Sequence, residues 1–228
     1  MKKELSFPEV TLRFLSHLSK NNNKEWFEAN RVRYNLEFLE PAIRFVLDLG
    51  EKLTQISPDL HYIPKIDKSI FRLHRDVRFS KDKSPYKINL GILLWEGSGK
   101  KLECSGYYFH LEPGNFFLGT GMYVFSDEQL KKYRNLVADN QTAKELFGII
   151  RNILKNKDFK LGGKTFKRVP KGFDPEYKYA DLMLHNGIYT YYETNNPSDL
   201  KDKYLVDFCF GKFKKQHQLH QWLVDNMI

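Results

Sequence analysis

The sequence concentrates its positive charge in one short stretch. Between positions 65 and 87 it has eight lysines and arginines against three aspartates, so five of the nine net positive charges of the chain lie there. Apolar residues alternate with the charged ones and a strand-like pattern follows, which distinguishes this stretch from a low-complexity basic tail. Cations held on an ordered scaffold either pair with carboxylates or attract an anion. We call residues 72–87 the basic segment.

The order of charged and apolar residues predicts which side chains act together. If the chain is extended over residues 71–80, successive side chains point to opposite faces. With Arg75 as an exception, one face would carry Phe71, Leu73, Val77 and Phe79. The other face would carry Arg72, His74, Asp76, Arg78 and Ser80. Guanidinium groups on this second face would bind a phosphate or a carboxylate bidentately.

We therefore predict that the basic segment binds a phosphate-containing ligand. This ligand would be a nucleotide-like small molecule or the backbone of a nucleic acid. The predicted ligand-binding residues are Arg72, Arg75, Asp76, Arg78, Lys81, Asp82, Lys83, Tyr86 and Lys87. The three arginines would hold the charge, the two aspartates would orient the arginines, and the tyrosine would cover the ligand.

An enzyme is a second interpretation of the same cluster. The cations would stabilise a developing negative charge, and His110 or Asp76 would move a proton. Tyr108, His110 and Glu112 alternate on one face of a predicted strand, so Glu112 would orient the imidazole as a general base. A solvated or hydrogen-bonded sheet face would produce the same pattern.

A structural role is a third interpretation, in which the aspartates pair with the arginines and function depends on a protein partner. Three structural features would separate the interpretations. A pocket that holds Arg78 and His110 together would favour the enzyme, and buried Arg–Asp pairs would favour the structural role. A broad positive groove with exposed phenylalanine or tyrosine would favour nucleic acid.

Cofactor and metal sites are not predicted. Gly162-Gly163-Lys164-Thr165 matches the end of a P-loop, but the first glycine of that motif falls on Asp158. Gly119-x-Gly121 is too short for a dinucleotide fingerprint. His217 and His220 have helical spacing without a nearby carboxylate or cysteine in the sequence, so we expect a solvent-facing pair.

Composition indicates a cytoplasmic protein. Cys104 and Cys209 are the two cysteines, too few for a disulfide framework. No stretch has the 18 or so consecutive apolar residues of a membrane span. The first residues have a basic start without an apolar core, so we expect neither a signal peptide nor membrane attachment.

Periodicity predicts an α+β fold in a single domain, residues 1–228, with N-terminal helices, a central antiparallel sheet with a Pro-Gly hairpin, and C-terminal helices. Helical stripes lie within residues 10–18, 27–38 and 42–56. Alternation predicts strands at 88–94, 106–111 and 115–124, with a type II turn at Pro113-Gly114. Helices at 126–139 and near 142–154 would begin with the capping boxes Ser126/Gln129 and Thr142/Glu145. A loop at 159–175, a strand at 187–193 and helices at 199–226, interrupted near Gly211, would follow.

Several motifs resemble one family. They are Asn22-Asn23-x-x-Trp26-Phe27, then Tyr34 and Pro41, the string from Arg75 to Lys87, the hairpin from Gly106 to Gly121, and Val169-Pro170-x-Gly172-Phe173. Together they resemble the family catalogued as domain of unknown function 2461, over nearly the whole chain. The resemblance implies a free-standing domain of about this length and implies no activity. Its signature positions fall in the basic segment.

Overall fold

The N-terminal helices occupy the first part of the chain in the computed structural model, which describes residues 7–195, 200 and 202–228. They are α1 (Glu9–Lys20), α2 (Lys24–Ala29), α3 (Arg31–Tyr34), the π-helical turn η1 (Asn35–Leu39) and α4 (Glu40–Leu53). Asn23 caps α2, because its side chain accepts a hydrogen bond from the Trp26 N–H at 2.8 Å. Pro41 lies in the first turn of α4, where its missing N–H costs nothing. The helices predicted from the three stripes are confirmed.

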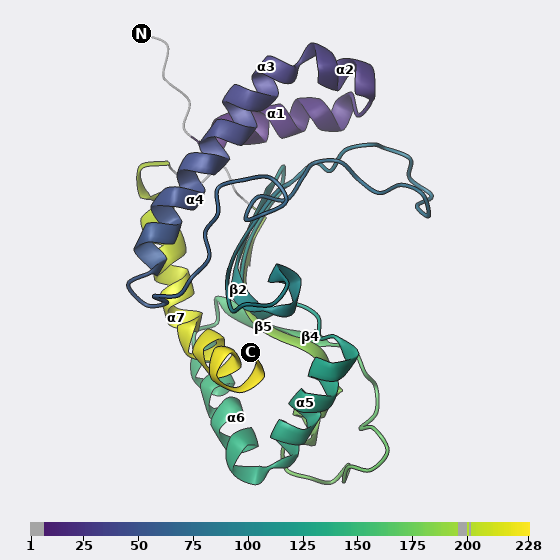
Figure 1. Ribbon diagram of the computed structural model, residues 1–228, viewed down its shortest axis with the longest axis vertical. Helices are drawn as coiled ribbons and strands as arrows, with labels where there is room; N and C mark the ends of the chain where they lie inside the picture. The colour runs from purple at the N-terminus through teal and green to yellow at the C-terminus, as the bar shows by residue number, and fades with distance from the viewer. Residues whose placement is uncertain (1–6, 196–199, 201) are drawn as a thin grey trace. The chain divides into compact units, whose positions relative to one another are not determined.

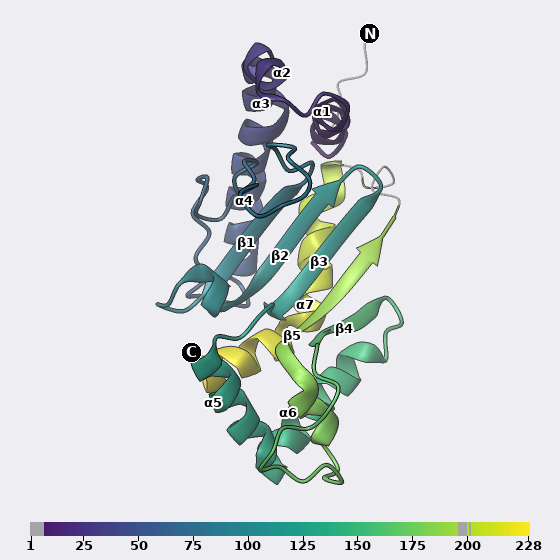
Figure 2. The same ribbon diagram turned by 90° about the vertical axis from the view of Figure 1, so that its right-hand side faces the viewer.

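Five strands form one sheet in the order β1-β2-β3-β5-β4 (Figure 2). They are β1 (Leu90–Glu96), β2 (Ser105–Glu112), β3 (Asn115–Met122), β4 (Phe159–Lys164) and β5 (His185–Thr194). Pro113 and Gly114 connect β2 to β3. Gly114 has a φ of 86°, a conformation that glycine adopts without strain. Helices at both ends of a central antiparallel sheet confirm the α+β class.

The strand β4 corrects the loop predicted at 159–175. Phe159 to Lys164 pair antiparallel with β5, and the register places Gly162 opposite Tyr189 and Lys160 opposite Tyr191. The glycine pair in this stretch is typical of a loop in the sequence. In the structure these glycines make room for neighbouring strands, since a Cβ on Gly162 would lie 2.3 Å from the Tyr189 ring. Pairing across the sheet therefore outweighs the local preference.

One of the two predicted capping boxes of the C-terminal helices is present, and the other is replaced by a different cap. α5 (Asp127–Ala138) begins with the predicted Ser126/Gln129 capping box. α6 (Asn140–Leu154) is capped by Asp139, which accepts from the Thr142 N–H at 2.9 Å, so the predicted box at Thr142 and Glu145 is wrong. The cap falls earlier because an aspartate already stands three residues before Thr142.

The last helix, α7 (Asp202–Met227), runs without a break through Gly211, so the predicted interruption is wrong. One glycine inside a helix costs only about 1 kcal/mol relative to alanine. Burial of side chains on both sides of it, such as Cys209 and Phe213, stabilises the helix by more than that. The 3-10 turns η2 (Lys101–Glu103) and η3 (Ala180–Leu184) complete the elements (Figure 1).

Contacts divide the chain into two compact units. Unit 1 comprises Met1–Leu94, Tyr108–Leu118 and Glu193–Gly211, and unit 2 comprises Trp95–Tyr107, Gly119–Tyr192 and Lys212–Ile228. In unit 1, α4 packs on the sheet through Phe45 and Phe109, whose ring centroids are 4.6 Å apart. In unit 2, α5, α6 and the end of α7 enclose a core that includes Tyr133, Leu146 and Leu223. That residues 1–228 are a single domain stays a prediction.

A helix that crosses a membrane must be both long and apolar. None of those within the described residues is long and apolar enough to cross a membrane.

Candidate functional site

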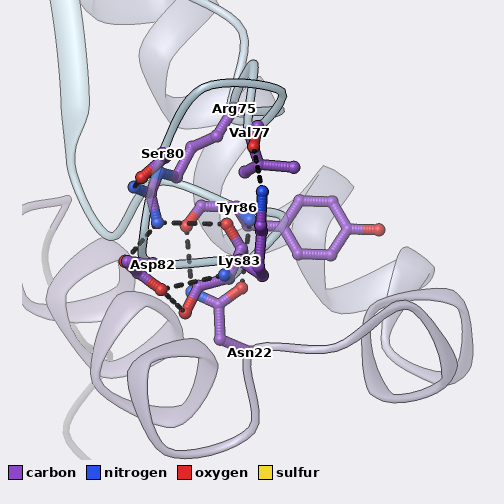
Figure 3. Close-up of polar contacts among 8 residues, drawn as sticks. Asn22, Arg75, Val77, Ser80, Asp82, Lys83 and Tyr86 are labelled. Carbon is purple, nitrogen blue, oxygen red and sulfur yellow. Dashed lines mark hydrogen bonds and ion pairs between the residues drawn. The ribbon is translucent and has the colours of Figure 1, made fainter.

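The N-terminal helices hold the basic segment in place through one asparagine. The Asn22 side chain donates to the Tyr86 carbonyl at 2.9 Å and accepts from the Tyr86 N–H at 3.0 Å (Figure 3). Both backbone groups of a residue far along the chain are thereby bonded to the start of α2. The segment is fixed at this end, which makes it an anchored loop of unit 1 (Figure 1).

Tyr86 also anchors the segment through its ring. The ring stacks on Phe27 with centroids 4.2 Å apart, and His74 packs edge-on at 4.9 Å from Tyr86. Only 3% of Tyr86 is exposed, and burial raises its pKa. A ligand covered by this ring would require the ring to leave the stack. The structure thus places Tyr86 in the packing between α2 and the segment.

Backbone pairing closes the base of the segment. Lys87 N–H donates to the Leu73 carbonyl at 2.7 Å, and Arg75 N–H donates to the Pro85 carbonyl at 2.9 Å. His74 and Tyr86 form an isolated antiparallel bridge between the two arms. Residues between these arms form a long loop, drawn in blue-green at the upper right of Figure 1.

Within the loop, Arg75 and Asp82 form an ion pair that is reinforced by serines. Arg75 also donates to the Ser84 carbonyl at 3.1 Å and to the Ser80 hydroxyl at 3.3 Å. Asp82 accepts from the Ser84 hydroxyl at 2.7 Å and from the Ser84 N–H at 2.9 Å. These bonds from Ser84, followed by the bond from Arg75, lower the pKa of Asp82 to about 2. Arg75 therefore orders the loop through these contacts.

Arg78 and Asp76 form a second pair, bidentate and in solvent. Arg78 donates to the Asp76 carboxylate through Nε at 2.9 Å and through Nη2 at 2.7 Å. The side chains are 77% and 47% exposed, so the pair is not the buried structural network that the third interpretation requires. An exposed pair stabilises a fold little and can exchange its partner for another anion.

The other cations of the basic segment leave positive charge uncompensated. Exposed Arg72 and Lys81 form no hydrogen bond or ion pair with a described residue. Lys83 donates to the Val77 carbonyl at 3.0 Å, a neutral acceptor. The Lys87 ammonium lies 5.8 Å from the centroid of the Phe71 ring, and burial, followed by the charge of Arg72, lowers its pKa. Six cations and two aspartates give the segment a net charge of +4.

Phe79 is the residue whose position the alternation pattern did not predict. It was expected on the apolar face with Leu73, which is 2% exposed, but Phe79 is 94% exposed. The expected alternation fails because the chain turns at this point, with the Ser80 N–H bonded to the Val77 carbonyl at 3.3 Å. The guanidinium of Arg78 lies 5.8 Å from the Phe79 ring centroid. A solvated aromatic ring therefore stands beside a cation in the loop.

The histidine predicted as a general base lies in a separate polar group on β2. His110 Nδ1 is 3.2 Å from the Tyr108 hydroxyl, and Nε2 is 3.5 Å from the Glu112 carboxylate. The second contact has ion-pair distance without hydrogen-bond geometry. Burial lowers the pKa of His110, so the ring is neutral near pH 7 and able to accept a proton. No contact in the described residues joins His110 to Arg78.

The C-terminal histidines belong to a polar network of unit 2 that the sequence did not indicate. His220 Nδ1 lies 2.9 Å from the Ser105 hydroxyl, and its Nε2 lies 3.0 Å from the Glu96 carboxylate. His217 Nδ1 lies 2.8 Å from the Tyr107 hydroxyl. The prediction of a solvent-facing pair is therefore wrong, because the sheet supplies polar partners from distant positions in the sequence.

This network is built like a nucleophile, a base and a carboxylate, but it is closed to substrates. Ser105 and His220 are fully buried, so the hydroxyl cannot reach a reacting group. Among the described residues no group of three histidine, cysteine, aspartate or glutamate side chains could hold a metal ion. The network therefore fixes α7 to β1 and β2 within unit 2.

A family model described as conserved hypothetical protein (DUF2461) matches residues 10–222. The chain belongs to this family. No curated protein and no solved structure matches it.

Proposed function

We propose that the protein binds single-stranded nucleic acid through the basic segment. The observation that carries the proposal is the exposure of Phe79 beside Arg78 in a segment of net charge +4. Proteins that bind single strands combine cations along the phosphate backbone with aromatic rings on which bases stack. The exposed ring of Phe79 gains no stabilisation from burial in the core, and a base that stacks on the ring would shield it from water.

The contacts within the segment support the proposal, because the residues that order the loop differ from those that are left to contact a ligand. Arg75 is used to order the loop, and Asn22 anchors its base. Arg72 and Lys81 are left to contact phosphates, and Arg78 could exchange Asp76 for a phosphate because their pair is exposed. The loop would thus present cations and one ring on a backbone that is already ordered, which lowers the entropic cost of binding.

Binding of a labelled oligothymidylate, followed by fluorescence anisotropy, tests the proposal. Stacking of one base on an aromatic side chain contributes about 1–3 kcal/mol. Phe79→Ala should therefore weaken binding about 5- to 150-fold, and Phe79→Tyr should retain most of it. Leu36→Ala is a matched control, since Leu36 is an exposed apolar residue outside the segment.

Four results would reject the proposal in different ways. Absence of oligonucleotide binding at low salt would reject it outright. Equal binding by wild type and Phe79→Ala would reject stacking. Binding to anionic vesicles in place of oligonucleotides would assign the exposed ring to a lipid surface, whereas competition by inorganic phosphate at comparable concentration would indicate a small ligand.

A further inference from the structure

Unit 2 carries a row of tyrosines on one face of its part of the sheet. The Tyr123 and Tyr189 ring centroids are 5.6 Å apart, and the Tyr189 and Tyr191 centroids are 6.0 Å apart. Tyr189 and Tyr191 alternate with Ile188 and Thr190, which are fully buried, so the two rings lie on the face away from the core. Tyr123, just after β3, is 77% exposed. We call these three residues the tyrosine row.

Glycines beside the row hold its central ring close to the backbone. A Cβ on Gly162 would lie 2.3 Å from the Tyr189 ring, and a Cβ on Gly121 would lie 2.8 Å from the Tyr189 Cα. Tyr189 therefore packs flat against the strand that pairs with its own. This packing explains Tyr189, but it leaves the exposure of Tyr123 at the end of the row without a structural role.

The strand β4 next to the row and the loop that follows it are together strongly basic. Residues 159–171 contain five lysines and arginines and no carboxylate. The first of them, Lys160, lies opposite Tyr191 in the register of β4 and β5, with its ammonium 5.9 Å from the ring centroid. β4 is the last strand of the sheet, so Lys160 and Lys164 lie on an edge strand, where Lys164 forms an ion pair with Asp181. Lys167, Arg168 and Lys171 are exposed.

We infer that the tyrosine row is a second contact for single-stranded nucleic acid, with bases on the rings and phosphates along the basic edge. Proteins that bind single strands place aromatic rings beside a line of cations. The rings accept any base, because every base has a π face that can stack on them. The charge favours an anionic occupant, because residues 159–171 contain five cations, of which Lys164 is ion-paired with Asp181. The inference rests on the proposed function and extends it to unit 2.

The experiment maps contacts on the full chain with an oligonucleotide that contains 5-bromouridine. Irradiation joins this base to an aromatic side chain stacked on it, and mass spectrometry identifies the residue. We expect adducts on Tyr123 in addition to Phe79. In anisotropy measurements Tyr123→Ala should weaken binding at least about fivefold, as expected for one lost stacking contact, and Tyr123→Phe should restore it.

Tyr204→Ala provides the matched control, because Tyr204 is a tyrosine with 58% exposure on α7. It should bind as wild type does. Adducts confined to residues 72–87, together with unchanged affinity of Tyr123→Ala, would overturn this inference and leave the proposed function standing. Adducts confined to the tyrosine row would overturn the proposed site. Failure of the wild-type chain to bind at low salt would overturn both.

Discussion

Replacing Asn22 by alanine should release the basic segment from the N-terminal helices. Asn22 satisfies both the N–H and the carbonyl of Tyr86, a residue with 3% exposure. A buried backbone group left without a partner costs about 1–3 kcal/mol, and the substitution affects two such groups. Because Asn22 is only partly buried, water can replace it in part, so we expect the free energy of unfolding to fall by about 2–4 kcal/mol in total. At roughly 2–4 °C per kcal/mol for a chain of this size, the melting temperature should fall by roughly 4–16 °C.

Thermal unfolding followed by circular dichroism measures the shift, and limited trypsin digestion locates it. Trypsin cleaves after lysine and arginine, so release of the segment should accelerate cleavage between residues 72 and 87. Asn21→Ala is the control, since the Asn21 side chain donates to the His17 carbonyl at the exposed end of its own helix. A melting temperature of Asn22→Ala within roughly 2 °C of wild type, with unchanged cleavage, would refute the anchoring role.

Three further predictions follow from the ion pairs and the buried network. The pKa of Asp82 is lowered to about 2, so the ionised Asp82 side chain should stabilise the fold fully above its ordinary pKa of 3.8 and lose this effect as pH falls through about 2. An NMR titration of the carboxyl group should show the low midpoint, and Ser84→Ala should raise that midpoint. His220→Ala should cost about 1–3 kcal/mol by removing the buried hydrogen-bond partner of Ser105 and Glu96, a loss that a urea melt would detect and that an unchanged midpoint would contradict. Arg78→Ala should leave the melting temperature close to wild type because its pair is exposed, and a large drop would show that the pair supports the fold.

Features that depend on neighbouring residues were predictable from the sequence. The capping box of α5 needs only Ser126 and Gln129, three positions apart, and both sit as expected. The helical stripe that includes Phe45 identified α4 because one apolar face repeats with the helical period. The excess of charge in the basic segment was readable because it is a property of composition.

Features that depend on distant partners were not predictable. β4 contains Gly162 and Gly163, and only its pairing with β5 makes the segment a strand. Phe79 shares the alternation of the buried residues before it, and only the turn at Val77–Ser80 places it in solvent. His220 meets Glu96 across 124 positions of sequence, a contact that no local pattern records. Tertiary context decides these cases.

The salt dependence of oligonucleotide binding tests the central claim most directly. Each phosphate contact with a single strand lowers the slope of log K against log salt by about 0.7, so four cations without carboxylate partners in the segment predict a slope of roughly −3 from this site. Lys81→Gln removes one of these cations and should make the slope less steep by about 0.7. A slope near zero for wild type, or an unchanged slope for Lys81→Gln, would contradict binding of the nucleic-acid backbone by the basic segment.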